Sequence, residues 1–445
     1  MRRISFLLLA LISLACVAPA ATRPRYGGTL RVAMQSMPTT FDLPAYSSPG
    51  DYWDMSHALS LVGDTLVRID PQSRPQPALA VAWQSDSGAR HWQFTLHHGV
   101  RFHDGTAASP AAVAQILGAL HPDWTVHATA PDSLMIDTEA STPSLLAELA
   151  LPRNLILTRN AAGIAIGTGP FHVADFQPGR FLKLAASEDC WSGRPFVDNV
   201  EIEFGQSLRD QSVALELGRA DIIQAANTSA RIRASSSLPV ELMVLVFSSD
   251  SKAQDPRLRK ALALAIDRKP IQSVVLKGAA EPAASILPNW MTGYSSVFST
   301  QADVQRAKAL LTDSRLSLTL SYDPRDAAQL IAERISLNAR EAGIILSVSL
   351  SGTADVRLAR IALPSPNPAV SLREAARQLA LPQPTPHGAT VEDLYQAERS
   401  LLDGTSVIPL FHLPLAYVAG SRVRGWVPDQ LGRWNLSDVW LEDSQ

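Results

Sequence analysis

Cysteine is scarce in this chain, and its scarcity excludes a fold held together by disulfides. Among 445 residues only Cys16 and Cys190 are cysteines, and Cys16 falls in a segment with the pattern of a leader. One remaining thiol cannot form an internal disulfide, so we expect packing to stabilise the mature fold. Hydrophobic residues make up 46% of the chain, which is enough for two or three lobes with cores of their own.

An excess of basic charge and the common catalytic motifs are also missing. The chain has 39 Lys and Arg against 42 Asp and Glu, a formal net charge of −3, which argues against nucleic acid or an anionic membrane surface as a partner. No G-x-S-x-G elbow, H-E-x-x-H pair, Walker loop or C-x-x-C motif occurs. We therefore expect a protein that is not an enzyme and needs no cofactor.

The N-terminus has the pattern of a secretory signal peptide over residues 1–20. Arg2-Arg3 precedes the apolar run Phe6 to Leu14, and small residues follow at Ala18-Pro19-Ala20. Leu14-Ala15-Cys16 also resembles part of a lipobox, so cleavage near Ala20 and a lipid anchor at Cys16 both stay open. Nothing later has 18 consecutive apolar residues. These features predict a periplasmic or other extracytoplasmic protein, free or tethered at its N-terminus.

Residues 92–117 carry the clearest local pattern. Trp92, Phe94 and Leu96 alternate with polar residues at the period of a half-buried strand, and Asp104-Gly105 supplies a turn. Ser109 as N-cap and Pro110 at the first helical position then predict the start of a helix. Such a hairpin followed by a helix occurs in many folds and names no function by itself.

The second half of the chain alternates helices and strands. Leu242 to Phe247 is a continuous apolar run, as expected of a central strand buried on both faces. Asp255-Pro256 opens a helix with one apolar stripe, and Asp323-Pro324 opens another. Ile344 to Leu350 follows as a strand. This alternation predicts an α/β fold with a parallel or mixed sheet.

An ordered set of segments resembles the family 5 extracellular solute-binding proteins, the peptide and nickel receptors of bacterial ABC importers. The segments are Gly27-Gly-Thr-Leu-Arg-Val-Ala33, residues 79–105, Gly167-Thr-Gly-Pro-Phe171, Trp191-Ser-Gly-Arg-Pro-Phe-Val-Asp198, Asp255 to Arg268, Ile408-Pro-Leu-Phe-His412 and Val423-Arg-Gly-Trp-Val-Pro428. No single segment is decisive, but together they run through most of the chain in the family's order.

The resemblance implies the two-lobed α/β fold of the large, class II periplasmic binding proteins, with a hinge between the lobes. Lobe I is expected over residues 21–240 and 408–445, with an inserted subdomain at about 50–160. Lobe II is expected over residues 241–407. The ligand would bind between the lobes, which close on it.

The same resemblance implies a function and partners. The leading hypothesis is the substrate-binding protein of an ABC importer, a monomer that captures a peptide or other small polar solute and delivers it to a permease in the inner membrane. A second hypothesis is an envelope sensor or scaffold protein with a degenerate ligand pocket.

That second hypothesis arises from residues 364–368, Pro-Ser-Pro-Asn-Pro. Peptide-binding relatives typically have Asp-x-x-Asp-Pro in this loop, where the first Asp binds the ligand's amino group. Pro364 has no side-chain acceptor, and no acidic residue occurs between Asp355 and Glu374. A buried ammonium without a partner is very costly, so the usual capture of a peptide N-terminus is in doubt.

Six residues are the candidates for ligand contact. Ser365 and Asn367 lie in the altered loop, and Thr39 follows the first strand. Trp290 and Tyr322 are placed by the resemblance and by strand ends, and His412 lies near the expected return to lobe I. No metal site is expected at His97, His98 and His103: His97 and His98 should point to opposite faces of a strand, so they cannot both reach one ion.

Overall fold

The fold is that of a computed structural model, which describes residues 23–43, 49–70, 72–225, 234–249, 253–311, 317–323, 327–350, 352–384 and 390–442. The predicted leader and Cys16 lie outside these ranges. Within them, no helix is long and apolar enough to cross a bilayer.

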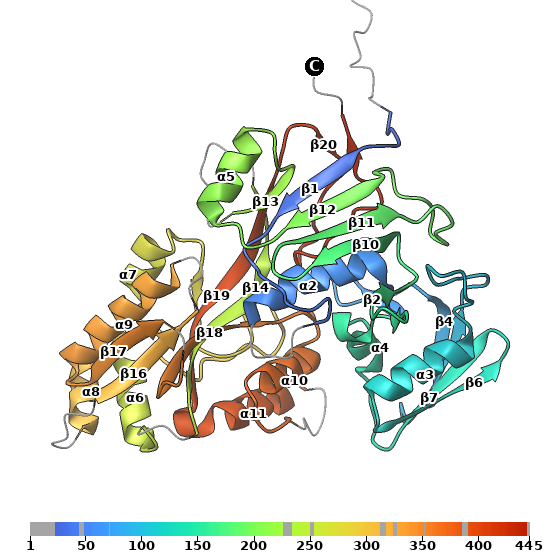
Figure 1. Cartoon of the computed structure of the whole chain (residues 1–445). Helices are drawn as coiled ribbons and strands as arrows, with labels where there is room; N and C mark the ends of the chain where they lie inside the picture. The colour runs from blue at the N-terminus through green and yellow to red at the C-terminus, as the bar shows by residue number, and fades with distance from the viewer. Residues whose placement is uncertain are drawn as a thin grey trace, which may run out of the picture.

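One 11-stranded sheet runs through the molecule and joins its two halves. Ten strands follow in the order β10 (Phe171–Gln177), β11 (Phe181–Ala186), β12 (Asn199–Glu203), β1 (Thr29–Ala33), β13 (Ile222–Gln224), β19 (Val407–Ala419), β14 (Ala234–Phe247), β18 (Val356–Ala362), β16 (Ser317–Tyr322) and β17 (Ile345–Leu350), and β15 (Glu281–Pro282) pairs with β19. The long strands β14 and β19 lie in the middle and cross from one half to the other (Figure 1). The expected mixed α/β sheet is confirmed.

The paired strands β14 and β19 are irregular where they cross. Their register shifts between Ser236 and Pro239 and again between Pro239 and Glu241, and Pro239 lies opposite Pro414. Proline has no N–H to give to the ladder, so neither residue donates a bond across the pair here. The ladder between the two crossing strands is therefore interrupted at these two prolines.

The half that contains β1 packs on the helix α2 (Pro49–Val62), while α5 (Leu208–Glu216) covers part of the other face (Figure 1). Leu30 and Val32 of β1 alternate with Arg31 and face the apolar side of α2. The C-terminal residues return to this half and add the short pair β20 (Val423–Arg424) and β21 (Trp440–Leu441).

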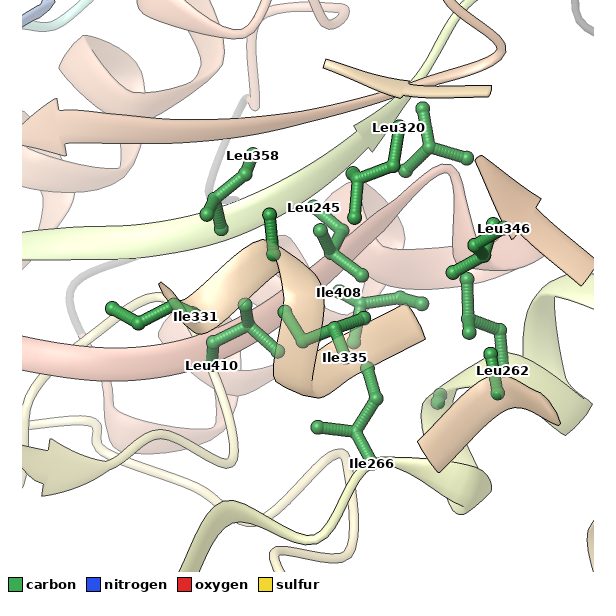
Figure 2. Packing of buried hydrophobic residues seen from close by; sticks show 14 of the residues in the cluster. Leu245, Leu262, Ile266, Leu320, Ile331, Ile335, Leu346, Leu358, Ile408 and Leu410 are labelled. Carbon is green, nitrogen blue, oxygen red and sulfur yellow. The ribbon is translucent and has the colours of Figure 1, made fainter. Parts of the chain in front are cut away.

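The other half builds its core on both faces of β14, β18 and β16. Its helical segments are α6 (Pro256–Ala265), α7 (Arg268–Pro270), the π-helical turn η2 (Ile271–Val275), α8 (Val304–Leu310), α9 (Ala328–Glu341), α10 (Pro368–Gln378), α11 (Val391–Leu402) and η3 (Asp403–Thr405). Leu245 and Ile408 of the crossing strands pack against Leu262 of α6 and Ile335 of α9 (Figure 2). The predicted cap is present, because the side chain of Asp255 accepts from Arg257 N.

A separate subdomain extends from the first half. Its sheet has the order β4 (Ala80–Ser85), β5 (His91–Leu96), β7 (Ser133–Thr138), β6 (Trp124–Ala130), covered by α3 (Pro110–Leu120) (Figure 1). Smaller elements join it to the rest: β2 (Val67–Ile69), β3 (Pro75–Pro77), α4 (Leu145–Leu149), the 3-10 turn η1 (Pro152–Asn154), β8 (Thr158–Arg159) and β9 (Ala165–Ile166). Ser109 caps α3 through Ala112 N, as its sequence predicts.

The sequence motif around His103 is hydrogen-bonded to the segment Gly167–Gly169, whose Gly169 N donates to Val62 O at the end of α2 at 2.9 Å. The Nε2–H of His103 donates to Gly169 O at 2.9 Å, and its Nδ1 accepts from Gly167 N at 3.3 Å. This pattern needs a neutral ring, and burial lowers the pKa of His103 below its usual range. The histidine is therefore a structural bridge between two motifs of the chain.

Glycine at position 167 is required by this arrangement. A Cβ atom there would lie 2.1 Å from Val62 O at the end of α2, so Gly167→Ala is expected to lower the free energy of unfolding by about 1–3 kcal/mol. Gly118 in α3 has nothing within 4 Å of the same position, so Gly118→Ala should be neutral or slightly stabilising. Chemical denaturation of both variants tests this, and equal stabilities would contradict it.

Candidate ligand-binding site

The first two turns of α2 lie where the halves of the molecule meet. Tyr52 and Trp53 pack with Val240 of β14, Ala362 of β18 and Leu431 of the C-terminal segment. Every α2 side chain from residue 52 to residue 59 is buried. A surface helix normally exposes one face. A stretch of helix that is buried on all sides and also carries polar residues is therefore unusual.

An aromatic cluster surrounds His57 of α2. The ring of His57 stacks on Trp434, with centroids 4.7 Å apart and planes 1° apart, and lies 5.9 Å from Trp53. The hydroxyl of Tyr417 is 3.3 Å from its Nδ1. Burial lowers the pKa of His57 to about 3, so the ring is neutral at physiological pH.

This helix holds side-chain atoms that have no hydrogen-bond partner among the described residues: Nε1 of Trp53, Oγ of Ser56 and Nε2 of His57. All three side chains are only 2% exposed. Such unpaired buried groups are rare in native proteins and call for an explanation. Asp54, by contrast, accepts from Gln224 Nε2 at 2.8 Å, and Gln224 Oε1 accepts from Gln35 N, which ties the loop after β1 to the helix.

A charged network closes the seam on the side of the subdomain. Arg153 of η1 forms ion pairs with Glu148 of α4 and with Glu374 of α10, and Glu374 also pairs with Arg377. Arg373 lies 3.4 Å from Glu148. Glu374 is 1% exposed and Glu148 is 5% exposed, so these carboxylates are buried and depend on the arginines. The network links the subdomain directly to α10.

The loop 364–367, which precedes α10, forms part of the same contact. Ser365 is buried, and its Oγ accepts from Asn367 N at 3.2 Å. Asn367 is the N-cap of α10, because its side chain accepts from Val370 N. Ser73 of the first half donates to Pro366 O at 3.4 Å. Two predicted ligand residues therefore lie in the seam and shape the start of α10.

Trp290 also reaches the seam, from a loop of the second half. Its Nε1 donates to Pro239 O at 2.8 Å, on the crossing strand. Glu398 of α11 holds this loop by accepting from Leu287 N and from Ser295 Oγ, both at 2.7 Å. Burial raises the pKa of Glu398 to about 7. The loop carrying Trp290 is thus anchored to a buried carboxyl group.

The other three candidates lie elsewhere. His412 is 2% exposed, its Nε2 donates to Ile286 O at 2.9 Å, and burial lowers its pKa to about 4. Tyr322 packs in the core of the second half, in register with Leu358 of β18. Thr39 is exposed in the loop after β1. The structure brings Trp290, Ser365 and Asn367 to the seam. Tyr322 is paired with Leu358 of β18, four residues before Ala362, which is the β18 residue at the seam.

Sequence reasoning did not single out Trp53, Ser56 or His57. A signal was present, because polar residues interrupt an apolar helix at Asp54, Ser56 and His57. Trp53 packs with β18 and the C-terminal segment, and His57 stacks on Trp434, all about 300 residues or more away in the sequence. Periodicity alone does not reveal such a contact.

A hollow also lies on the first half, and it is lined by none of the seam residues described above. It has a volume of about 730 Å³ and is lined by strands β1, β11 and β12. Its charges are of both signs, among them Lys183 and Glu201, which pair at 3.1 Å. Among the described residues, no group of three or more His, Cys, Asp or Glu side chains could hold a metal ion.

Comparisons with known proteins agree with this architecture. The middle-region model of the bacterial extracellular solute-binding proteins, family 5, matches residues 74–357. The di/tripeptide-binding protein 2 of Pseudomonas aeruginosa is 26% identical over 434 residues, 80% of either chain. The nickel-binding protein NikA of Staphylococcus aureus is 25% identical over 234 residues, and the chain spans 48% of that protein's length.

Solved structures show the same fold at lower identity. The dipeptide-binding protein of Pseudoalteromonas sp. SM9913 superposes with a TM-score of 0.82 at 16% identity, covering 93% of this chain and all of that one. NikA of Staphylococcus aureus gives a TM-score of 0.80 at 17% identity with the same coverage. The predicted two-lobed α/β fold is confirmed.

Proposed function

Because the chain belongs to the family 5 extracellular solute-binding proteins of bacteria, we propose that it captures a peptide or another small polar solute between its two lobes and delivers it to the permease of an ABC importer. The observation that carries this proposal is the seam itself. Trp53 of α2 packs there against β14 and β18, and its Nε1, like Oγ of Ser56 one turn along the helix, is buried without a partner among the described residues.

The course of the two crossing strands supports a division into two lobes. We place lobe I over residues 21–240 and 408–445, with the subdomain at about 50–160, and lobe II over residues 241–407. The weakened pairing at Pro239 and Pro414 supports a hinge between them. Bending at one point of two long strands would separate α2 from β18 while leaving both cores intact.

The ligand would enter between α2 on one side and the loop 364–367 with Trp290 on the other. Ser365, Asn367 and Trp290 line that space in this proposal. Contact of Thr39, Tyr322 and His412 with the ligand stays a prediction. Trp53 and Ser56, which sequence reasoning passed over, join the set because of their position in the seam.

Several further features belong to the proposal. The protein binds its cargo as a monomer without catalysing a reaction and acts outside the cytoplasm, after export by the segment 1–20, with or without a lipid on Cys16. Its permease lies in the inner membrane. The relatives favour import over the sensor or scaffold alternative, since several of the matching proteins are named for a peptide or for nickel that they bind.

A melting-temperature screen tests the proposal. Ligand that binds only the folded protein raises its stability, by about 2.7 kcal/mol at a hundredfold excess over Kd. The purified protein should melt several degrees higher with a member of dipeptide, oligopeptide or metal–chelate libraries. If no compound shifts the melting temperature, while the protein is folded and monomeric, import of these solutes is ruled out.

A further inference from the structure

We propose that Trp53 and Ser56 form an oxygen-binding subsite for the cargo, and that the cargo is a small carboxylate with an apolar body whose free amino group is not required. This inference rests on the proposed function and adds the chemical class of the ligand.

The unpaired polar atoms locate the subsite. Trp53 Nε1 and Ser56 Oγ are both buried and both lack a partner among the described residues. The two residues are three positions apart on α2, so they share one face of the helix. A buried donor without an acceptor costs about 1–3 kcal/mol, so two of them on one face indicate an acceptor that comes from outside the chain.

The subsite lies where a solute can reach it once the lobes separate. Trp53 contacts Val240 of the crossing strand and Ala362 at the end of β18. The helix also contacts η1, which carries Arg153 of the charged network. Opening of the hinge would therefore expose this face of α2 to the cleft, and closure would bury it again.

The chemistry of these groups selects an oxygen acceptor. An indole N–H can only donate, so the ligand atom beside Trp53 Nε1 must accept. A carboxylate offers two oxygens and can take one bond from each side chain. A ligand ammonium cannot replace it, because it has donors only.

The charged network beside η1 points the same way, and the buried carboxylates near the seam have partners of their own: Asp54 accepts from Gln224, and Glu241 lies 3.8 Å from Arg360. The network beside η1 contains three arginines, Arg153, Arg373 and Arg377, against the two carboxylates Glu148 and Glu374. The loop 364–368 has no acidic side chain that would bind an amino group. The apolar wall of Trp290 and Val240 suits a hydrocarbon or aromatic body on the ligand.

Dipeptides blocked at one end test the contributions of the ligand's carboxylate and of its ammonium group separately. We expect N-acetyl dipeptides, which keep the carboxylate and lose the ammonium, to raise the melting temperature and to bind in calorimetry. The amides of the same dipeptides, which keep the ammonium and lose the carboxylate, should bind at least tenfold more weakly. Tighter binding of the amides, or no binding of any carboxylate in the set, overturns the inference.

Two substitutions test the residues. Trp53→Phe keeps an aromatic ring and removes only the N–H, and Ser56→Ala removes only the hydroxyl. Each is expected to weaken carboxylate binding by about tenfold, the value of one hydrogen bond to a charged group. Trp426→Phe is the matched control, since Trp426 Nε1 is also buried and unpaired but belongs to the core of lobe I. It should bind as the parent protein does.

The outcomes distinguish the inference from the function it rests on. If the parent protein binds a library compound but Trp53→Phe and Ser56→Ala bind it equally well, the subsite is wrong and import stands. If the parent protein binds nothing, both fail. A loss of affinity in Trp426→Phe equal to that in Trp53→Phe would also contradict the inference, because the effect would then come from packing.

Discussion

Replacing Glu374 by glutamine is expected to lower the free energy of unfolding by about 3 kcal/mol, because it leaves buried arginine charge without its partner. Glu374 is 1% exposed and pairs with Arg153 of the subdomain and Arg377 of its own helix. The change keeps the shape of the side chain and removes its charge. Urea denaturation at neutral pH measures the difference.

A surface ion pair supplies the control for this substitution. Lys183 and Glu201 pair at 3.1 Å, but their side chains are 42% and 44% exposed. Exposed pairs contribute less than about 1 kcal/mol, so Glu201→Gln should have little effect. If the two Glu→Gln variants lose equal stability, the buried network does not hold the subdomain against α10.

The second large effect is the change in stability on acidification from pH 7 to pH 5. Two buried histidines lower the stability, and one buried carboxyl group raises it. His57 and His412 have folded pKa values of about 3 and about 4, below the usual 6.5. The unfolded chain therefore binds protons that the folded protein refuses, and stability falls as the pH drops below about 6.5. Each histidine should account for a loss of about 2 kcal/mol by pH 5.

Glu398 acts in the opposite direction. Its folded pKa of about 7 lies above the usual 4.5, so the folded protein takes up a proton that the unfolded chain does not. Stability from this group rises by about 2 kcal/mol as the pH falls from 7 to 5. These three groups together should therefore lower the stability by only about 2 kcal/mol over this range, since the carboxyl group offsets one histidine.

The Glu398→Gln substitution should reveal the full loss of stability caused by the two histidines, because it removes the carboxyl group that partly offsets it. This variant should lose about 4 kcal/mol between pH 7 and pH 5, and His412→Asn in the same background should lose about 2 kcal/mol less. Denaturation curves at several pH values measure these slopes. A slope in Glu398→Gln no steeper than in the parent protein would show that Glu398 is ionised in the folded state at pH 7.

Much of the fold could be predicted from local sequence. The caps at Ser109 and Asp255, the apolar run of Leu242 to Phe247 and the ordered motifs indicated the helices, the central strand and the family. These signals are short in range, because a cap or a strand period depends on neighbours within a few residues. Local sequence did not reveal that Asn367 caps α10 at Pro368.

The candidate site was harder to predict because it is assembled from distant segments. Asn367 was proposed as a ligand residue from its place in the family loop, and its side chain caps α10. Trp53 becomes notable only when β18 and the C-terminal segment bury it, which no local pattern reports. Loss of the loop carboxylate at Pro364, in contrast, was visible in the sequence alone and led to the question of an altered cargo.

Native mass spectrometry of the gently purified protein tests the central claim most directly. If the chain captures a solute between its lobes, part of the population should carry a non-covalent adduct of a few hundred daltons that is released on unfolding. The mass of the adduct then identifies the cargo, and a carboxylate is expected. A spectrum with the bare chain alone, together with no melting shift from any library compound, would contradict the role of solute-binding protein.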